Sequence, residues 1–164
     1  MRDNRVPNSQ FELPKDCHSK IGGIFEYWSS IPRASGLPAR CQLDPVDISP
    51  ELLPNILLIE PDGVPPRFQF RLLGTGITRF AGRDNTGKWM DQLYDDFEGN
   101  LSHQALCRVV RDGVPDYRSG RPVNVKFGDW VHVERIYLPL AENGRTVDMI
   151  PGLTVFQNAQ GQIF

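Results

Sequence analysis

The sequence predicts an α+β fold with an antiparallel sheet, and three observations lead to this prediction. Apolar patterns typical of strands occur near the middle of the chain. The longest helical pattern comes next, and a second group of strand patterns follows it. Grouped strands and helices, without strict alternation, are typical of an antiparallel sheet with helices packed on one face. In order, the predicted elements are two strands over 56–59 and 68–72, a helix over 96–112, and three strands over 122–127, 130–140 and 146–156.

Composition sets the broad class of protein. A chain of 164 residues with 40% hydrophobic residues is long enough for one domain with a real core. The formal net charge of -2 provides no basic surface for nucleic acid. No apolar run approaches the ~18 residues of a membrane span, and the N-terminus lacks the apolar core of a signal peptide. Three widely spaced cysteines fit a reduced, cytoplasmic protein better than a disulfide scaffold.

The chain divides into four predicted segments. Residues 1–20 form a polar arm, and residues 21–54 hold a helix and a proline-rich connector. Residues 55–157 form the core, and residues 158–164 form a tail. The helix is indicated by an apolar stripe at i, i+3, i+4 and i+7 spacing that ends before a proline: Ile21, Ile24, Phe25, Trp28 and Ile31. This stripe covers the core of its own chain or serves as a docking or dimerisation surface.

Details of the strands and turns follow from local chemistry. Phe68, Phe70 and Leu72 alternate with polar residues, so we expect them on one buried face. Asn143-Gly144 is typical of a type I′ hairpin turn. Pro151-Gly152 within the last strand predicts a bulge or a sheet edge.

The ends of the long helix also carry signals. Asp96 is the expected N-cap, because a side-chain oxygen there can accept from the first free backbone N–H groups. Gly113 is the expected residue just after the last helical turn, where a left-handed backbone favours glycine.

Glycine-rich segments raise the possibility of a phosphate-binding loop. The run from Gly82 to Trp89 differs from a Walker A motif only at its last position, where Trp89 stands in place of the hydroxyl that holds Mg²⁺. Gly74-Thr75-Gly76 begins a dinucleotide fingerprint, but Arg79 occupies the place of the third glycine. The predicted strand order lacks the parallel units that both motifs require. We therefore interpret these glycines as structural turns.

Residues for catalysis or metal binding are sparse. His103 and Cys107 lie four residues apart on the long helix but flank its apolar stripe, and a metal site would need further ligands. A single histidine can hold haem, so His103 remains a candidate axial ligand. The sequence has no nucleophile elbow, H-E-x-x-H or C-x-x-C motif, and no catalytic or metal-binding residue is predicted.

Several short motifs taken together carry a family resemblance over roughly residues 21–156. They are Tyr27-Trp28, Gly36-Leu37-Pro38-Ala39-Arg40, Asp44-Pro45-Val46-Asp47-Ile48 with Leu53-Pro54, Phe68 with Arg71-Leu72-Leu73-Gly74-Thr75, Gly82-Arg83-Asp84 with Thr86-Gly87, and Leu138-Pro139-Leu140 with Asn143-Gly144. With these motifs the chain resembles the PAS domains, and in particular a family of small stand-alone bacterial PAS proteins.

The resemblance implies a five-stranded antiparallel sheet with a pocket between its inner face and the helices, preceded here by an N-terminal helix. PAS domains sense ligands, light or redox state, or mediate protein contacts. The segment 82–93 has no cysteine, so flavin-adduct chemistry is excluded, and haem would depend on His103 alone.

We therefore predict a non-enzymatic PAS sensor or interaction module with an apolar pocket for a small ligand. No output segment follows Phe164, so we expect the signal to pass to a separate signalling protein or a homodimer. The alternatives are a PAS adaptor without ligand and a small α+β isomerase or hydrolase. The expected pocket residues come from the second strand and the helical middle: Phe70, Leu72, Phe80, Trp89, Phe97, His103, Leu106 and Val109.

Overall fold

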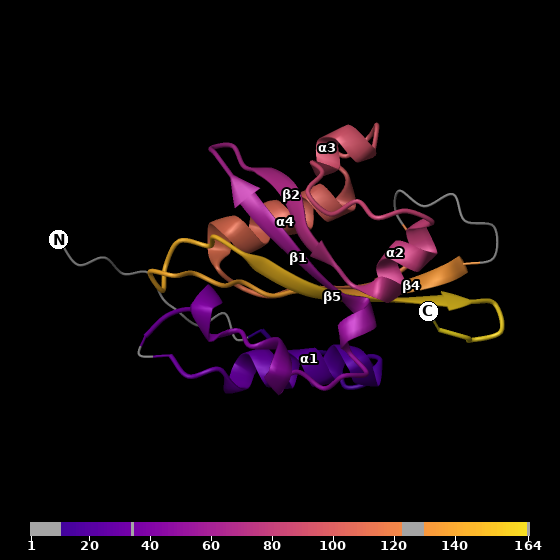
Figure 1. The fold of residues 1–164 in the computed structure, drawn as a ribbon, viewed down its shortest axis with the longest axis horizontal. Helices are drawn as coiled ribbons and strands as arrows, with labels where there is room; N and C mark the ends of the chain where they lie inside the picture. Colours follow the sequence, from indigo (N-terminus) through magenta and orange to yellow (C-terminus); the bar gives the residue numbers. More distant parts are fainter. Residues whose placement is uncertain (1–10, 34, 123–129, 164) are drawn as a thin grey trace.

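The computed structural model describes residues 11–33, 35–122 and 130–163. In these residues five strands form one antiparallel sheet with the order β2-β1-β5-β4-β3 (Figure 1). Two strands precede the helical middle and three follow it, as predicted. The strands are β1 (Ile56–Asp62), β2 (Arg67–Leu73), β3 (Asp116–Gly120), β4 (Trp130–Tyr137) and β5 (Ile150–Asn158).

One face of the sheet is covered by helix α1 (Ser19–Ser30), which lies below the sheet in Figure 1. The predicted apolar stripe faces the strands: Ile21, Ile24 and Trp28 are buried there against Ile136 and other outward-facing strand residues. The indole Nε1 of Trp28 donates to the carbonyl of Pro139 at 3.0 Å. The stripe therefore covers the core of its own chain, which is the first of the two interpretations of this helix.

The other face is covered by the helical middle. It consists of α2 (Thr75–Ala81), α3 (Met90–Leu93) and α4 (Leu101–Asp112). A second apolar core lies between these helices and the sheet. Its largest side chains include Phe68, Phe97, Leu106 and Ile150. Three short 3-10 turns connect α1 to β1: Arg40–Gln42, Pro45–Asp47 and Leu53–Asn55.

The predicted alternation of β2 is correct for two residues and wrong for the third. Phe68 and Phe70 are buried on the inner face, whereas Leu72 is 45% exposed. Ile59 pairs with Phe70 while its neighbour Leu58 pairs with Leu72, so one extra residue stands in β2 at this point. This β-bulge reverses the faces beyond it, because side chains alternate with a period of two. Leu73 takes the inward position instead.

One other prediction about the strands fails for a non-local reason. Pro151-Gly152 lies in the central strand β5, not at an edge, and is paired on both sides. The carbonyl of Pro151 accepts from Leu138, just beyond the end of β4, so the missing N–H falls where that ladder ends. Between β4 and β5 the register shifts at Trp130 and His132 instead. The predicted strand 122–127 and the turn after it fall largely outside the described residues, and β3 forms earlier in the chain.

The turn at Asn143-Gly144 also differs from the predicted type I′ hairpin turn. The N–H of Gly144 donates to the carbonyl of Ala141 at 3.0 Å, which closes a four-residue turn with Asn143 in its third position. The bridge on either side of this turn joins Leu140 to Met149, so the connection is longer than a two-residue type I′ loop. Gly144 has a positive φ of 75°.

Helix α4 ends as predicted and begins later than predicted. Gly113 has a φ of 63° and donates to the carbonyl of Val109, which is the expected C-terminal arrangement. At the other end, Asn100 caps the helix through a hydrogen bond from the backbone N–H of His103, and Asp96 lies before it. Within the described residues, no helix combines the length and the apolar character that a membrane crossing requires.

Candidate functional site: a cavity on the inner face of the sheet

A partly enclosed cavity of about 130 Å³ lies between the inner face of the sheet and the helical middle. Most of its wall is apolar or aromatic, and a few polar groups interrupt it. Concave, mostly apolar sites with a few polar groups are the usual form of small-molecule pockets. The lining residues are Leu57, Phe70, Leu73, Ile77, Ala81, Asn85, Met90, Tyr94, Ser102, Arg118, Pro122, Val133, Arg135, Tyr137, Thr154 and Phe156.

The strand pairing brings the polar part of the wall together. Arg118 of β3 pairs directly with Arg135 of β4, and Arg135 pairs on its other side with Thr154 of β5. The three side chains therefore form one row across the inner face. Directly paired residues have Cβ atoms about 5 Å apart, so their side chains interact.

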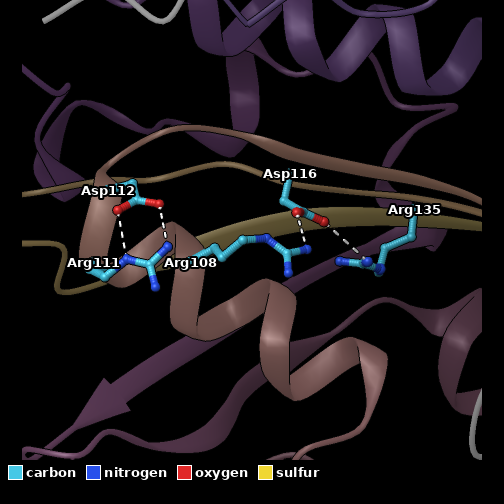
Figure 2. Close-up of polar contacts among 5 residues, drawn as sticks. All are labelled: Arg108, Arg111, Asp112, Asp116 and Arg135. Atoms are coloured by element: carbon cyan, nitrogen blue, oxygen red, sulfur yellow. Dashed lines mark hydrogen bonds and ion pairs between the residues drawn. The ribbon is translucent and has the colours of Figure 1, made fainter.

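Arg135 is the most deeply buried charge of this row, with its side chain 7% exposed. Its Nη2 forms an ion pair with Oδ1 of Asp116 at 3.3 Å, and the other carboxylate oxygen of Asp116 pairs with Nη2 of Arg108 at 2.8 Å. Figure 2 shows Asp116 between the two guanidinium groups. Arg108 comes from α4 and is 47% exposed, so the shared carboxylate connects the cavity wall to the surface of that helix.

The flat guanidinium of Arg135 also lies over the ring of Tyr137, with 3.9 Å between Cζ and the ring centroid. A cation over a desolvated aromatic face gains about 2 kcal/mol. One nitrogen remains: within the described part of the chain, Nη1 of Arg135 is buried and has no hydrogen-bond partner. The ion pair with Asp116 and the contact with the Tyr137 ring fix the position of this side chain, whereas Nη1 is unsatisfied among the described residues.

A second orphaned polar group is found on the helical side of the same cavity. Asn85 lies in the loop between α2 and α3 and is 5% exposed. Its Oδ1 is buried and, among the described residues, has no partner. A buried polar atom without a partner costs about 1–3 kcal/mol, so such atoms require an explanation. Both orphaned atoms belong to residues that line this cavity.

Tyrosines complete the polar rim. Burial raises the pKa of Tyr94, and the neighbouring Tyr137 adds to this rise. The phenol of Tyr94 therefore stays protonated at neutral pH and can donate a hydrogen bond. The pKa of Arg118, in contrast, is lowered. Burial is the main cause, and the nearby charge of Arg135 adds to it.

Of the predicted pocket residues, the structure brings Phe70 to the cavity wall. Phe80 lies directly behind the wall and stacks on the lining residue Phe156. Leu72 points away from the cavity because of the β-bulge described above. Trp89 stacks under the guanidinium of Arg67, at 4.3 Å from Cζ to the ring centroid, and its neighbour Met90 lines the cavity instead.

The remaining four predicted residues belong to the apolar core beside the cavity. Phe97, Leu106 and Val109 are fully buried there and are not part of the wall. His103 packs edge-on against Phe68 and Phe97, with ring centroids 6.0 Å and 5.1 Å away. These residues fill the space that the sequence predicted as the pocket.

His103 does not offer a haem ligand in this arrangement. Its Nδ1 accepts a hydrogen bond from the backbone N–H of Gly99 at 3.0 Å, so the proton resides on Nε2. Nε2 in turn lies 3.6 Å from Sγ of Cys107, within hydrogen-bond distance for sulfur. Both ring nitrogens of His103 therefore contact groups at or near the start of α4. In the part of the chain that is described, no three His, Cys, Asp or Glu side chains gather as a metal site.

The glycine-rich loop 82–87 serves as a structural turn. The N–H of Gly87 donates to the carbonyl of Phe70 and the carbonyl of Lys88 accepts from the N–H of Phe70, so this segment adds a short pairing to the outer edge of β2. A phosphate-binding loop would need the N–H of Gly87 to be free, but this N–H donates to Phe70. The preceding β2 is antiparallel to its neighbour, unlike the strand before a Walker A loop.

The sequence missed the polar wall because its members are not neighbours in the chain. Arg118, Arg135 and Thr154 carry no local motif, and Arg118 lies in a strand that the sequence pattern did not predict. Alternation over 130–140 was the one available signal. Val133, Arg135 and Tyr137 have the same parity and share the inner face, while Glu134 and Ile136 share the other.

The outer face of β4 connects the sheet to α1. Glu134 is buried, and its Oε2 accepts from the backbone N–H of His18 at 2.8 Å and from the hydroxyl of Tyr117 at 3.1 Å. His18 caps α1 through Nδ1. Adjacent residues of one strand thus contact the cavity on one side and the start of α1 on the other.

An open antiparallel sheet of this order, with its helical middle packed over a cavity on the inner face, is the architecture of PAS domains. A PAS domain family model matches residues 17–155, and the chain belongs to this family. The match includes α1 as well as the sheet and the helical middle. PAS domains are in general non-catalytic modules that sense signals or mediate interactions with partners or with themselves. Comparison with curated proteins gives no match to this chain.

Proposed function

We propose that this protein is a non-enzymatic PAS sensor that binds a small ligand in the cavity and passes its state to a separate protein or to a second copy. The observation that carries the proposal is the composition of the cavity wall. An apolar surface surrounds two deeply buried polar side chains, those of Asn85 and Arg135, each with an atom that has no partner in the described part of the chain. Such a wall suits a ligand with an apolar body and a polar end.

The connection from the cavity to the outside runs through β4. Arg135 faces the cavity, and the preceding residue, Glu134, accepts a hydrogen bond from the N–H of His18 at the start of α1. A ligand that moves β4 by a fraction of an ångström would alter this contact and the position of α1. Only a ligand with different affinities for the two positions of α1 can produce such a shift.

The wall favours binding over catalysis. Its described residues include no Asp, Glu, His or Cys that could act as a base or nucleophile. The three cysteines are free thiols in the structure, which is consistent with a reducing compartment such as the cytoplasm.

A second candidate is a PAS adaptor that binds no ligand. It is favoured by the dense core beside the cavity, where Phe97, Leu106 and Val109 fill the space with the chain's own side chains. The two candidates differ in what they predict about the cavity of about 130 Å³: the sensor needs it, and the adaptor does not.

Native mass spectrometry and an absorbance spectrum of protein purified from its own host would distinguish the two. A bound small molecule that is lost in Ala81→Phe, which fills the cavity, supports the sensor. Val46→Phe adds the same ring at a position that is 87% exposed and should retain the molecule. A homogeneous mass without ligand in all three proteins would favour the adaptor.

A further inference from the structure

Among the described residues, the inner face of the sheet carries more positive than negative charge at the cavity. Arg118 and Arg135 are direct cross-strand partners and both line the cavity. Like charges in this position destabilise a sheet. The pairing therefore needs a compensating group.

The carboxylate near this pair provides only part of the compensation. Asp116 contacts Arg135 at 3.3 Å, and it contacts Arg108 more closely, at 2.8 Å. Figure 2 shows this division of one carboxylate between two guanidinium groups. Arg118 donates through Nη2 to a neutral acceptor, the carbonyl of Arg121, at 2.6 Å. Asp116 thus carries a single negative charge beside three guanidinium groups.

The unpaired nitrogen of Arg135 lies at the same place where a compensating negative charge is lacking. Nη1 of Arg135 is buried and, among the described residues, unpaired, although its residue lines the cavity. Burying a charged donor without a partner is energetically unfavourable. A negatively charged acceptor would supply both the hydrogen bond and the compensating charge. The lowered pKa of Arg118, caused by burial and then by Arg135, is the expected effect of such an excess of positive charge.

We infer that the ligand of this cavity is a small organic carboxylate whose carboxylate group contacts the guanidinium of Arg135 and whose body lies against the apolar wall. The inference rests on the ligand-binding function proposed above and specifies its ligand class. Arg118 contributes its charge from the next strand. The amide of Asn85 on the opposite wall supplies a further polar contact, since its oxygen and nitrogen can exchange places by a flip.

The remaining wall limits the body of the ligand. Phe70, Tyr94, Tyr137 and Phe156 provide aromatic surface, and the aliphatic lining of α2 covers the opposite side. A buried apolar cavity of about 150 Å³ accepts benzene. The cavity of about 130 Å³ is slightly smaller but only partly enclosed, so it takes a body of benzene size or less, with the rest of the ligand extending toward its open side. An inorganic phosphate would leave this apolar surface uncovered, so we favour the organic acid.

Benzoate and benzamide form a matched pair of probes, because they share shape and ring and differ in charge. Protein-observed NMR titrations at neutral pH should give at least about tenfold tighter binding of benzoate, the value of one additional charge-assisted hydrogen bond. Arg135→Gln should abolish this preference. Arg108→Gln removes the other guanidinium on the same Asp116, outside the cavity, and should keep it.

Each other result has a defined meaning. Equal affinities for benzoate and benzamide in wild type, or a preference that persists in Arg135→Gln, overturn the carboxylate inference while the proposed sensor stands. Resonances that respond to neither probe, or to inorganic phosphate alone, also overturn the inference. The proposed function is then judged separately by the mass of the ligand from the native host.

A second variant keeps the test decisive if Arg135→Gln does not fold. Arg118→Gln removes the partly exposed member of the cross-strand pair and relieves the like-charge contact, so we expect it to fold. It should weaken benzoate binding severalfold with no change for benzamide. Unchanged binding of benzoate in this variant contradicts the inference.

Discussion

Phe80 of α2 and Phe156 of β5 stack face to face, with ring centroids 3.8 Å apart and an interplanar angle of 9°. Phe156 lines the cavity, so this contact holds the short helix α2 against the wall of the candidate site. Helices of this length have little stability of their own and depend on tertiary packing. The stacked pair is therefore a main attachment of α2.

We predict that Phe80→Ala destabilises the protein by about 2 kcal/mol, less than the 3–5 kcal/mol of a fully buried Phe. Phe80 is only half-buried, which explains the smaller value. Urea unfolding measures the stability, and hydrogen exchange of residues 75–81 should rise more than that of α4. Phe80→Leu, which keeps much of the apolar contact, should have about half the effect. Exchange that rises equally throughout the chain would contradict a local role.

The attachment of α1 to the sheet gives a second prediction. Trp28→Phe removes the hydrogen bond from Nε1 to the buried carbonyl of Pro139 and leaves that oxygen unpaired. We expect a loss of about 1–2 kcal/mol in chemical denaturation. Tyr27→Phe is the matched control on the same helix, because its hydroxyl bonds with Asp44 are exposed and water can replace them. A control variant as unstable as Trp28→Phe would show that the buried bond has no special role.

Two glycines should respond to alanine in opposite directions. A Cβ at Gly152 would lie 2.8 Å from the carbonyl oxygen of Ile136 and 3.1 Å from Cδ1 of Leu57, in the middle of the sheet. Gly152→Ala should therefore cost about 1–3 kcal/mol. At Gly22 in α1 nothing lies within 4 Å of the added carbon, so Gly22→Ala should stabilise by about 0.5–1 kcal/mol. Thermal unfolding of both variants tests the pair, and a neutral Gly152→Ala would show that β5 can shift locally.

Tyr117 predicts a pH dependence of stability. Burial, with the hydrogen bond donated to Glu134 as a further cause, raises the pKa of its phenol from 10.0 to about 12. The folded state thus holds this proton more tightly than the unfolded state. The contribution to stability is complete below pH 10 and is lost as the pH rises from 10 to about 12.

Urea midpoints across this pH range test the prediction. In wild type the midpoint should fall more steeply than in Tyr117→Phe, which cannot ionise at this position. The two proteins should show parallel pH profiles below pH 10, where the phenol is protonated in both states. Identical slopes above pH 10 would mean that the phenol titrates with its ordinary pKa.

Much of the fold could be predicted from the sequence where the signal is local. The apolar stripe of α1 and its end before Pro32 follow from helical periodicity, and the structure has α1 at Ser19–Ser30. The end of α4 at Gly113 follows from the preference of a left-handed residue for glycine. The order of strands and helices followed from the same kind of pattern. Each of these features depends on residues within a few positions of one another.

The candidate site was predicted less well, because it depends on pairing between distant segments. Phe70 was placed correctly from alternation, but Leu72 was not, since a bulge opposite β1 reverses its face. The eight predicted residues came from the second strand and the helical middle, and all but His103 are large apolar side chains. Most such side chains, including Leu106 and Val109, pack against one another and close the space between them.

What the sequence by itself determined is the α+β order, the apolar stripe of α1, the C-terminal end of α4 and the resemblance to PAS domains. Only the tertiary structure showed which charged side chains line the cavity. The register of β3 against β4 sets Arg118 opposite Arg135, and that of β4 against β5 sets Arg135 opposite Thr154. Register depends on hydrogen bonds between strands far apart in the chain, and a slip of one residue would send these side chains to the other face. No local pattern in the sequence contains that information.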